Sequence, residues 1–192
     1  MKKNITYFEK YGVVNTDKVL NLAKERFLDL NLKHVVLASS FGDTAVKALK
    51  YFSSNELCVV SSRYGYRNPG MHSLNEDNLD ILKKSGVKIV FQTHVFSGID
   101  IAISNLYGGI SFAQHTSNIL KMIGHGFKVC VEIAIMAADS GCIPVNQEII
   151  SIGGNVRGVD TALVVLPVHS NRLLDMQIKE IVCMPRVRRA IS

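Results

Sequence analysis

Two short runs of small and polar residues have the composition of phosphate-binding turns. The first consists of Ser39, Ser40, Phe41, Gly42, Asp43 and Thr44. The second consists of Gly153, Gly154, Asn155, Val156, Arg157 and Gly158. Each follows an apolar run, so each is expected at the end of a strand. Small residues there let backbone N–H groups approach an anion, and a helix that starts there adds its positive end. We therefore predict a pocket for a phosphorylated small molecule.

The side chains of these turns supply matching chemistry. Ser39, Ser40 and Thr44 can donate hydrogen bonds to a phosphate, while Gly42 permits a tight approach. Arg157 can clamp the same group with its forked guanidinium. Ordinary turns use the same residue types, and the second run lacks both the dinucleotide-binding glycine spacing and a P-loop lysine. A single run of this kind is therefore better explained as an ordinary turn than as a ligand site.

Two further strand ends carry polar residues, Ser62-Arg63 and Thr93-His94. Ligands of open α/β sheets bind outside the carboxyl ends of the strands, so four polar strand ends together favour a binding site. The predicted binding residues are Ser39, Ser40, Phe41, Gly42, Asp43, Thr44, Ser62, Arg63, Thr93, His94, Gly153, Gly154, Arg157, Gly158, Asp160 and Thr161. Within this set, Asp160 is expected either to orient the glycine loop or to bond a ligand hydroxyl.

His94 is the best acid or base candidate among the six histidines, although a loop histidine with a structural hydrogen bond is the more common case. The sequence shows no Ser-His-Asp arrangement and no metal-ligand spacing, so enzymatic activity stays open and no metal is expected. Tyr64 and Tyr66, beside Arg63 and Arg67, can stack on a planar ring or cover an apolar edge.

Alternating strands and helices must position these residues. Strands are predicted at residues 34–38, 57–60, 87–91, 148–152, 162–166 and 180–183, and helices from Asp17, after Thr44, up to Gly86, and at 99–106, 116–123 and 127–138. Ser73 and Glu76 have the spacing of a capping box for the helix that Gly86 ends. The alternation predicts a single α/β domain over residues 1–192. It is a three-layer α/β/α sandwich with a mainly parallel sheet and an antiparallel strand among the last three.

Composition excludes several classes of protein. Hydrophobic residues make up 47% and charged residues 20%, which favours a large core over disorder. The net charge of +6 is spread along the chain and aromatic residues are only 7%, so nucleic-acid binding is not expected. Residues 129–138 are the longest apolar tract, interrupted by Glu132 and too short to span a bilayer. The four cysteines are far apart, as expected for reduced core thiols. We expect a soluble, cytoplasmic protein.

Residues 95–124 form a long excursion between core elements, and such excursions often carry lids or oligomer contacts. Its apolar residues, among them Ile99, Leu106 and Phe112, make a homo-oligomer the expected state.

Three segments, residues 128–141, 158–162 and 178–186, resemble a family of short prokaryotic, largely archaeal proteins. These proteins are described as similar to the C-terminal α/β domain of pyruvate kinase, and the resemblance covers nearly the whole chain. It implies a three-layer sandwich with one antiparallel strand, and flavin mononucleotide (FMN) as a ligand of the pocket. In pyruvate kinase this domain carries a regulatory phosphate site at a turn that matches residues 39–44. Relatives often have Gly-Thr-Gly-Arg-Gly where this chain has residues 154–158, and the bulk of Val156 would hinder close backbone approach there.

The resemblance does not imply pyruvate kinase activity, because that chemistry belongs to a separate barrel of roughly 250 residues. The leading hypothesis is an FMN-binding domain. Its phosphate would bind at residues 39–44 with help from Arg157, and its ring near Thr93, His94 and the excursion. The alternatives are a non-catalytic sensor of a phosphorylated metabolite and a structural subunit that docks on a partner protein.

Overall fold

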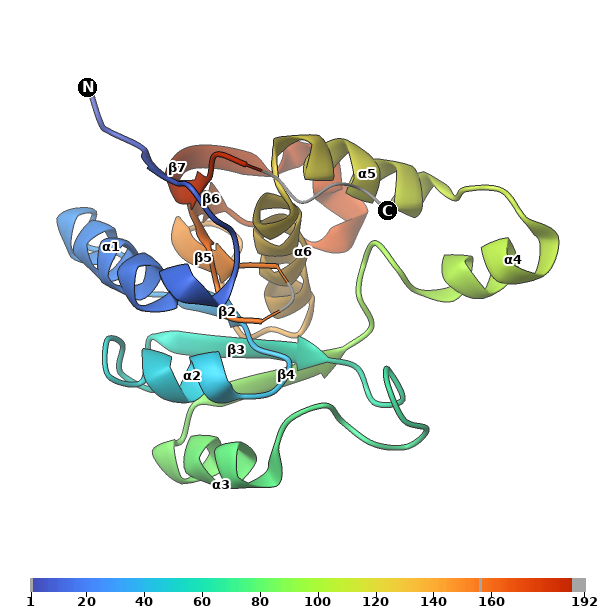
Figure 1. The fold of residues 1–192 in the computed structure, drawn as a ribbon, viewed down its shortest axis with the longest axis horizontal. Helices are drawn as coiled ribbons and strands as arrows, with labels where there is room; N and C mark the ends of the chain where they lie inside the picture. The colour runs from blue at the N-terminus through green and yellow to red at the C-terminus, as the bar shows by residue number, and fades with distance from the viewer. Residues whose placement is uncertain (1, 156, 188–192) are drawn as a thin grey trace.

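A single seven-stranded sheet organises the computed structural model, which describes residues 2–155 and 157–187. The strands are β1 (Thr6–Phe8), β2 (Val35–Ala38), β3 (Leu57–Ser62), β4 (Lys88–Gln92), β5 (Ile149–Gly153), β6 (Thr161–Leu166) and β7 (Gln177–Pro185). Their order is β1-β7-β6-β5-β2-β3-β4 (Figure 1). Within it, β6 is antiparallel to both neighbours and every other pair is parallel. This confirms the expected mixed sheet with one antiparallel strand.

Helices cover both faces of the sheet. On one face lie α1 (Thr16–Asp29), α2 (Asp43–Ala48) and α3 (Glu76–Ser85), and on the other lies α6 (His125–Asp139) with α5 (Phe112–Ile123) packed against it. Side chains alternate along β2 between the faces: Val35 and Leu37 pack with α1 and α2, whereas Val36 packs with α6. Figure 1 shows α2 and α3 on one side of β3 and β4, with α6 on the other. The three-layer α/β/α sandwich is confirmed.

The central helix α6 is apolar on nearly every side because the sheet and α5 surround it. Residues Cys130–Ala138 are all buried, and they pack against β2, β3, β5 and β6. A charged pair, Lys128 and Glu132, interrupts this apolar surface. The helix starts at His125, two residues before the predicted start. Its first two turns lie beside the carboxyl ends of the neighbouring strands, because both line the same cavity.

Local capping differs from the prediction in two helices. The side chain of Asn75, not Ser73, caps α3 by accepting hydrogen bonds from the N–H groups of Asp77 and Asn78. The capping-box prediction was wrong because Glu76 is the first helical residue. A capping box does exist at α5, where Ser111 and Gln114 bond reciprocally, and this helix begins four residues earlier than predicted.

Several elements were not predicted. The N-terminal strand β1 pairs in parallel with β7, with Thr6 opposite Cys183. Two short 3₁₀ helices, η1 (Val13–Asn15) and η2 (Ser170–Asp175), precede α1 and β7. The helix expected in the excursion is confirmed as α4 (Ile99–Tyr107), which projects from the body of the molecule (Figure 1).

Candidate functional site

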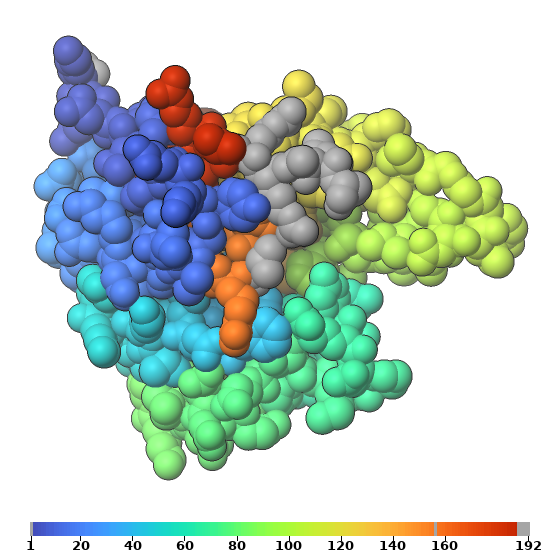
Figure 2. All heavy atoms as spheres, in the orientation of Figure 1, coloured from blue at the N-terminus to red at the C-terminus, as the bar shows by residue number. Residues whose placement is uncertain are grey.

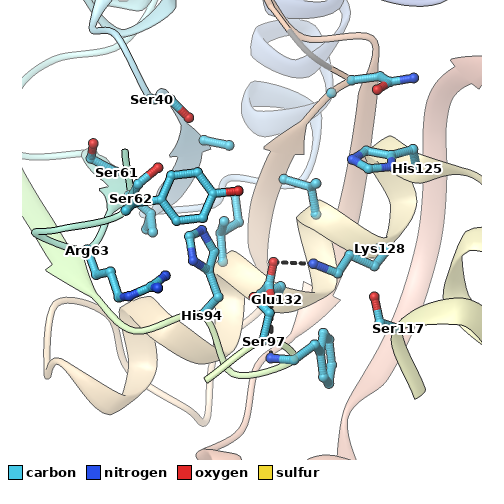
Figure 3. Close-up of a pocket in the computed structure, with 18 of the residues that line it drawn as sticks. Ser40, Ser61, Ser62, Arg63, His94, Ser97, Ser117, His125, Lys128 and Glu132 are labelled. Carbon is cyan, nitrogen blue, oxygen red and sulfur yellow. Dashed lines mark hydrogen bonds and ion pairs between the residues drawn. The ribbon is translucent and has the colours of Figure 1, made fainter. Parts of the chain in front are cut away.

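A cavity of about 950 Å³ lies at the carboxyl ends of β2, β3, β4 and β5, beside the start of α6. The turn after β2 contributes Ser40, the end of β3 contributes Ser62 and the segment after it Arg63, and His94 follows β4. Lys128 and Glu132 enter from α6, and Ser117 and Lys121 from α5. In Figure 3 the labelled side chains from these elements surround one space. The parallel strands thus bring four sequence-distant segments to one edge of the sheet, as α/β topology requires.

Most of the predicted binding residues line this cavity. They are Ser39, Ser40, Phe41, Asp43, Thr44, Ser62, Arg63, His94, Gly154, Arg157 and Gly158. Five others do not: Gly42, Thr93, Gly153, Asp160 and Thr161. Val156 lies outside the described residues, so the hindrance expected from its side chain stays a prediction.

Asp160 orients the chain rather than facing the cavity. Its buried carboxylate accepts hydrogen bonds from the Gly12 N–H at 2.8 Å and from the hydroxyl of Thr161 at 2.8 Å. Burial raises the pKa of this carboxyl, and the N–H and hydroxyl donors oppose the rise. Of the two roles foreseen for Asp160, the geometry supports loop orientation, because the Gly12 bond ties the N-terminal segment to the turn before β6.

The glycines of the second turn are required by contacts within the protein. A Cβ atom at Gly154 would lie 2.6 Å from the carbonyl oxygen of Gly158, and one at Gly153 would lie 2.9 Å from the carbonyl oxygen of Gly126. Gly42 adopts a left-handed φ of 92°, and its Cβ would lie 2.6 Å from the Cβ of Asn78. We predicted that these glycines let backbone N–H groups approach an anion. Close packing within the protein explains their presence more simply.

Arg157 reaches across the mouth of the cavity to the first turn. Its Nη2 lies 3.1 Å from the Asp43 carboxylate, and its guanidinium carbon lies 5.1 Å from the centre of the Phe41 ring. Arg67 also lies over Phe41, at 4.7 Å. Ser39 is partly engaged, since its hydroxyl accepts the Ala45 N–H at 3.3 Å. Ser40 is exposed and directed toward the cavity (Figure 3), so it is the freer hydroxyl of this turn.

Sequence reasoning missed the charged pair at the base of the cavity. Glu132 is 2% exposed, pairs with the Lys128 ammonium and accepts the Phe96 N–H at 3.1 Å (Figure 3). A signal existed: a lysine and a glutamate four residues apart in a helix that is otherwise apolar all round indicate a buried ion pair. Lys121, one helix away, is also part of the lining. Burial, together with the charge of Lys128, lowers the pKa of Lys121.

His94 lies among these charges. Burial lowers its pKa, as do Lys128 and Arg63, while the nearby Glu132 carboxylate opposes them. The imidazole is therefore neutral at physiological pH, and its ring centre lies 5.2 Å from that of Tyr66. His94 Nδ1 and the Ser61 hydroxyl are both buried without a hydrogen-bond partner among the described residues. Such orphan groups are uncommon in native proteins, where buried polar atoms are usually paired with protein groups or ordered water.

The cavity carries a surplus of positive charge. Its described lining contains five cationic side chains, those of Arg63, Arg67, Lys121, Lys128 and Arg157. The two carboxylates of that lining, Asp43 and Glu132, are each already paired with one of these cations. The formal surplus of three charges suits an anionic ligand.

The described part of the chain contains neither a metal-binding cluster nor a membrane-spanning helix. Residues 2–155 and 157–187 contain no cluster of three or more His, Cys, Asp or Glu side chains that could hold a metal ion. None of the described helices is both long and apolar enough to cross a membrane.

One comparison with known proteins identifies the fold family. A family model described as "Pyruvate kinase, alpha/beta domain" matches residues 17–165, more than three quarters of the chain. The match starts in α1 and ends in β6, so it includes all four strand ends that border the cavity. The chain therefore belongs to the pyruvate kinase alpha/beta domain family.

Proposed function

We propose that this protein binds a phosphorylated small molecule in the cavity, with FMN as the leading candidate, and that it has no pyruvate kinase activity. The observation that carries the proposal is the charge balance: three cations of the described lining are left without a lining carboxylate. The volume of about 950 Å³ is within the range of small-molecule and cofactor sites.

The phosphate of such a ligand would bind at the turn of residues 39–44. The exposed hydroxyl of Ser40 and the donors of Arg157 that Asp43 leaves free are its expected partners. Asp43 acts here as a positioning carboxylate, because it holds the guanidinium at the mouth of the cavity. Arg67, whose guanidinium carbon lies 4.7 Å from the centre of the Phe41 ring, adds a second positive charge.

A planar ring would lie deeper, against Tyr66 and His94. The Tyr66 and His94 rings, whose centres lie 5.2 Å apart, offer aromatic surface to a planar ring, and the unpaired cations of the lining suit a phosphate. On these two observations a flavin fits the residues present. FMN supplies redox chemistry when bound. The contribution of this chain would be to orient the ring, to hold a neutral imidazole beside it and to balance its phosphate charge.

Visible absorption of the purified protein tests the proposal, with mass spectrometry of any molecule released by heat. We expect flavin bands, or their appearance on incubation with FMN. Ser40→Ala and Arg157→Ala should each weaken binding about ten- to a hundredfold, because each removes a hydrogen bond to a charged group. Arg172→Ala, an exposed arginine outside the cavity, is the matched control and should bind as the wild type does.

One observation favours a second candidate, a sensor of a metabolite with two anionic groups. Arg63 and Lys128 lie on opposite sides of the cavity in Figure 3, so the positive charge is not confined to one end. A protein that stays colourless with FMN, but whose melting temperature rises with a sugar bisphosphate, would replace the flavin proposal with this one. A protein that responds to neither ligand would contradict both.

A further inference from the structure

The helices α4 and α5 form a projecting arm, defined here as residues 99–123. No residue of α4 is buried, although five of its nine residues are Ile, Leu or Tyr, and Ser117 is the one buried residue of α5. Figure 1 shows α4 standing away from the sheet, and Figure 2 shows the same segment as a protrusion on the surface. A helix of this composition normally packs its apolar residues against another surface.

The exposed apolar side chains of the arm are numerous and large. Tyr107 is 77% exposed, Phe112 78% and Leu106 73%. The others are Ile99, Ile101, Ile103, Ile110, Ile119, Met122 and Ile123. Ile101 and Ile110 also line the cavity. The other eight side chains expose on the order of 800 Å² of mainly apolar surface, counting roughly 100 Å² for each. A stable protein–protein interface needs roughly 800 Å² from each partner, so the arm alone provides enough.

A groove beside the arm extends this apolar surface. It has a volume of about 560 Å³ and is lined by Phe96, Phe112, Ile135, Leu173 and Leu174, among others. Leu174, on η2, is 91% exposed at its edge. The arm and the groove share Phe112, so a partner that covers the arm also reaches the groove.

Charge decides what kind of partner this surface fits. The only Asp, Glu, Lys or Arg residues between 99 and 123 are Asp100 and Lys121. The Asp100 carboxylate accepts hydrogen bonds from the Gly98 N–H and from the Ser111 hydroxyl, and Lys121 lines the cavity. The outer surface of the arm is therefore close to neutral. Anionic lipid surfaces and nucleic acids attract basic faces, which the arm lacks.

A neutral apolar surface can pack against a copy of itself without like charges meeting, as a two-fold symmetric interface requires. We propose that a second copy of this chain docks on the arm, so that α4 of each protomer packs against the arm and the groove of the other. The arm also supplies Gln114, Ser117 and Lys121 to the cavity. Docking therefore places the dimer interface next to one wall of the cavity.

Sedimentation equilibrium at micromolar concentrations tests the proposal. The wild type should sediment with twice the 21.2 kDa mass of one chain. Leu106→Glu and Phe112→Glu each place a charge in the interface and should raise the dimer dissociation constant at least a hundredfold. Leu28→Glu is the matched control, because Leu28 is 62% exposed on α1, away from the arm, and this variant should remain a dimer.

Two further measurements make the test decisive. Circular dichroism should show that both arm variants retain the helix content of the wild type, since neither side chain is buried in one chain. A wild type that sediments as a monomer would overturn the proposal, and so would a dimer that persists in both arm variants. Co-sedimentation of monomeric wild type with phosphatidylcholine vesicles would assign the arm to a lipid surface instead.

Discussion

The Lys128–Glu132 pair places two opposite charges inside α6, where the neighbouring residues are apolar. Removing one partner leaves the other charge buried and uncompensated, which costs roughly 3–5 kcal/mol. We expect Lys128→Met to lower the free energy of unfolding by about that amount in a urea titration at neutral pH. The double variant Lys128→Met/Glu132→Gln is the control, because it leaves no unpaired charge and keeps an acceptor for the Phe96 N–H. Its loss should be much smaller, and an additive loss would show that the two charges are not coupled.

His94 makes stability depend on pH in a direction set by burial. Its pKa in the folded protein lies below the ordinary value of 6.5, so between these two values the unfolded chain binds a proton that the folded chain does not. The free energy of unfolding should therefore fall as the pH drops below 6.5. Burial and Lys88 shift the pKa of His34 in the same direction, so it adds to the effect. Urea titrations at several pH values should show a shallower dependence in His94→Gln, and an unchanged dependence would contradict the assignment.

The four cysteines should differ sharply in reactivity. Burial raises the pKa of Cys58 and Cys130 and raises that of Cys183 to about 12, so these thiols rarely form the nucleophilic thiolate. Cys142, just after α6, is only partly buried. A chromogenic disulfide reagent should therefore modify Cys142 first in the native protein and all four cysteines in concentrated guanidinium chloride. Rapid native modification of the Cys142→Ser variant would contradict this order.

At the scale of the element, Gly126 shows packing overriding helix propensity. Alanine is better than glycine inside a helix by about 1 kcal/mol. A Cβ at Gly126 would nevertheless lie 2.2 Å from the Thr161 hydroxyl and 2.5 Å from an Asp160 carboxylate oxygen, both of them buried. Overpacking of this kind costs roughly 1–3 kcal/mol, so Gly126→Ala should destabilise the protein on balance. A thermal melt with an unchanged or higher midpoint would show that α6 moves to accommodate the methyl group.

Some helices and strands can be predicted well from the sequence, and others cannot. The α6 helix and strands β2, β3 and β5 are predictable because burial on both sides makes them continuous apolar runs. The cap of α3 was assigned wrongly because Ser73 and Asn75 compete within three residues, and only the chain path decides between them. Strand β1 was missed because three residues beside several charges give no periodic signal, and its pairing with β7 depends on the far end of the chain.

At the scale of the whole molecule, the convergence of strand ends was predictable and the charge of the site was not. Parallel strands must bring Ser40, Arg63 and His94 to one edge, whatever the details of packing. The charged residues of the helices line the same cavity only because α6 and α5 are rotated to face it. These residues are Lys128, Glu132 and Lys121. Rotation follows from the packed core, which no local pattern specifies.

The architecture of the sheet also predicts whether this chain can catalyse the pyruvate kinase reaction. All seven strands in residues 2–155 and 157–187 belong to one sheet, so the described chain contains no barrel of the kind that carries pyruvate kinase chemistry. We expect the purified chain to transfer no phosphoryl group from phosphoenolpyruvate to ADP in an assay coupled to lactate dehydrogenase. Turnover well above the uncatalysed rate, lost in the Arg63→Ala variant, would contradict this expectation.

The pairing of β1 with β7 has a consequence for how the protein is made. Thr6 and Cys183 are register partners, and more than 170 residues separate them along the chain. During synthesis β1 leaves the ribosome before the other six described strands, yet its neighbour in the sheet, β7, is the last of the seven to emerge. Until then the strand lacks its partner, and the loop that its pairing closes is longer than that of any other strand pair in the sheet. Completion of the sheet should therefore be a late and slow folding step, governed by this closure rather than by the helices, which form locally and early.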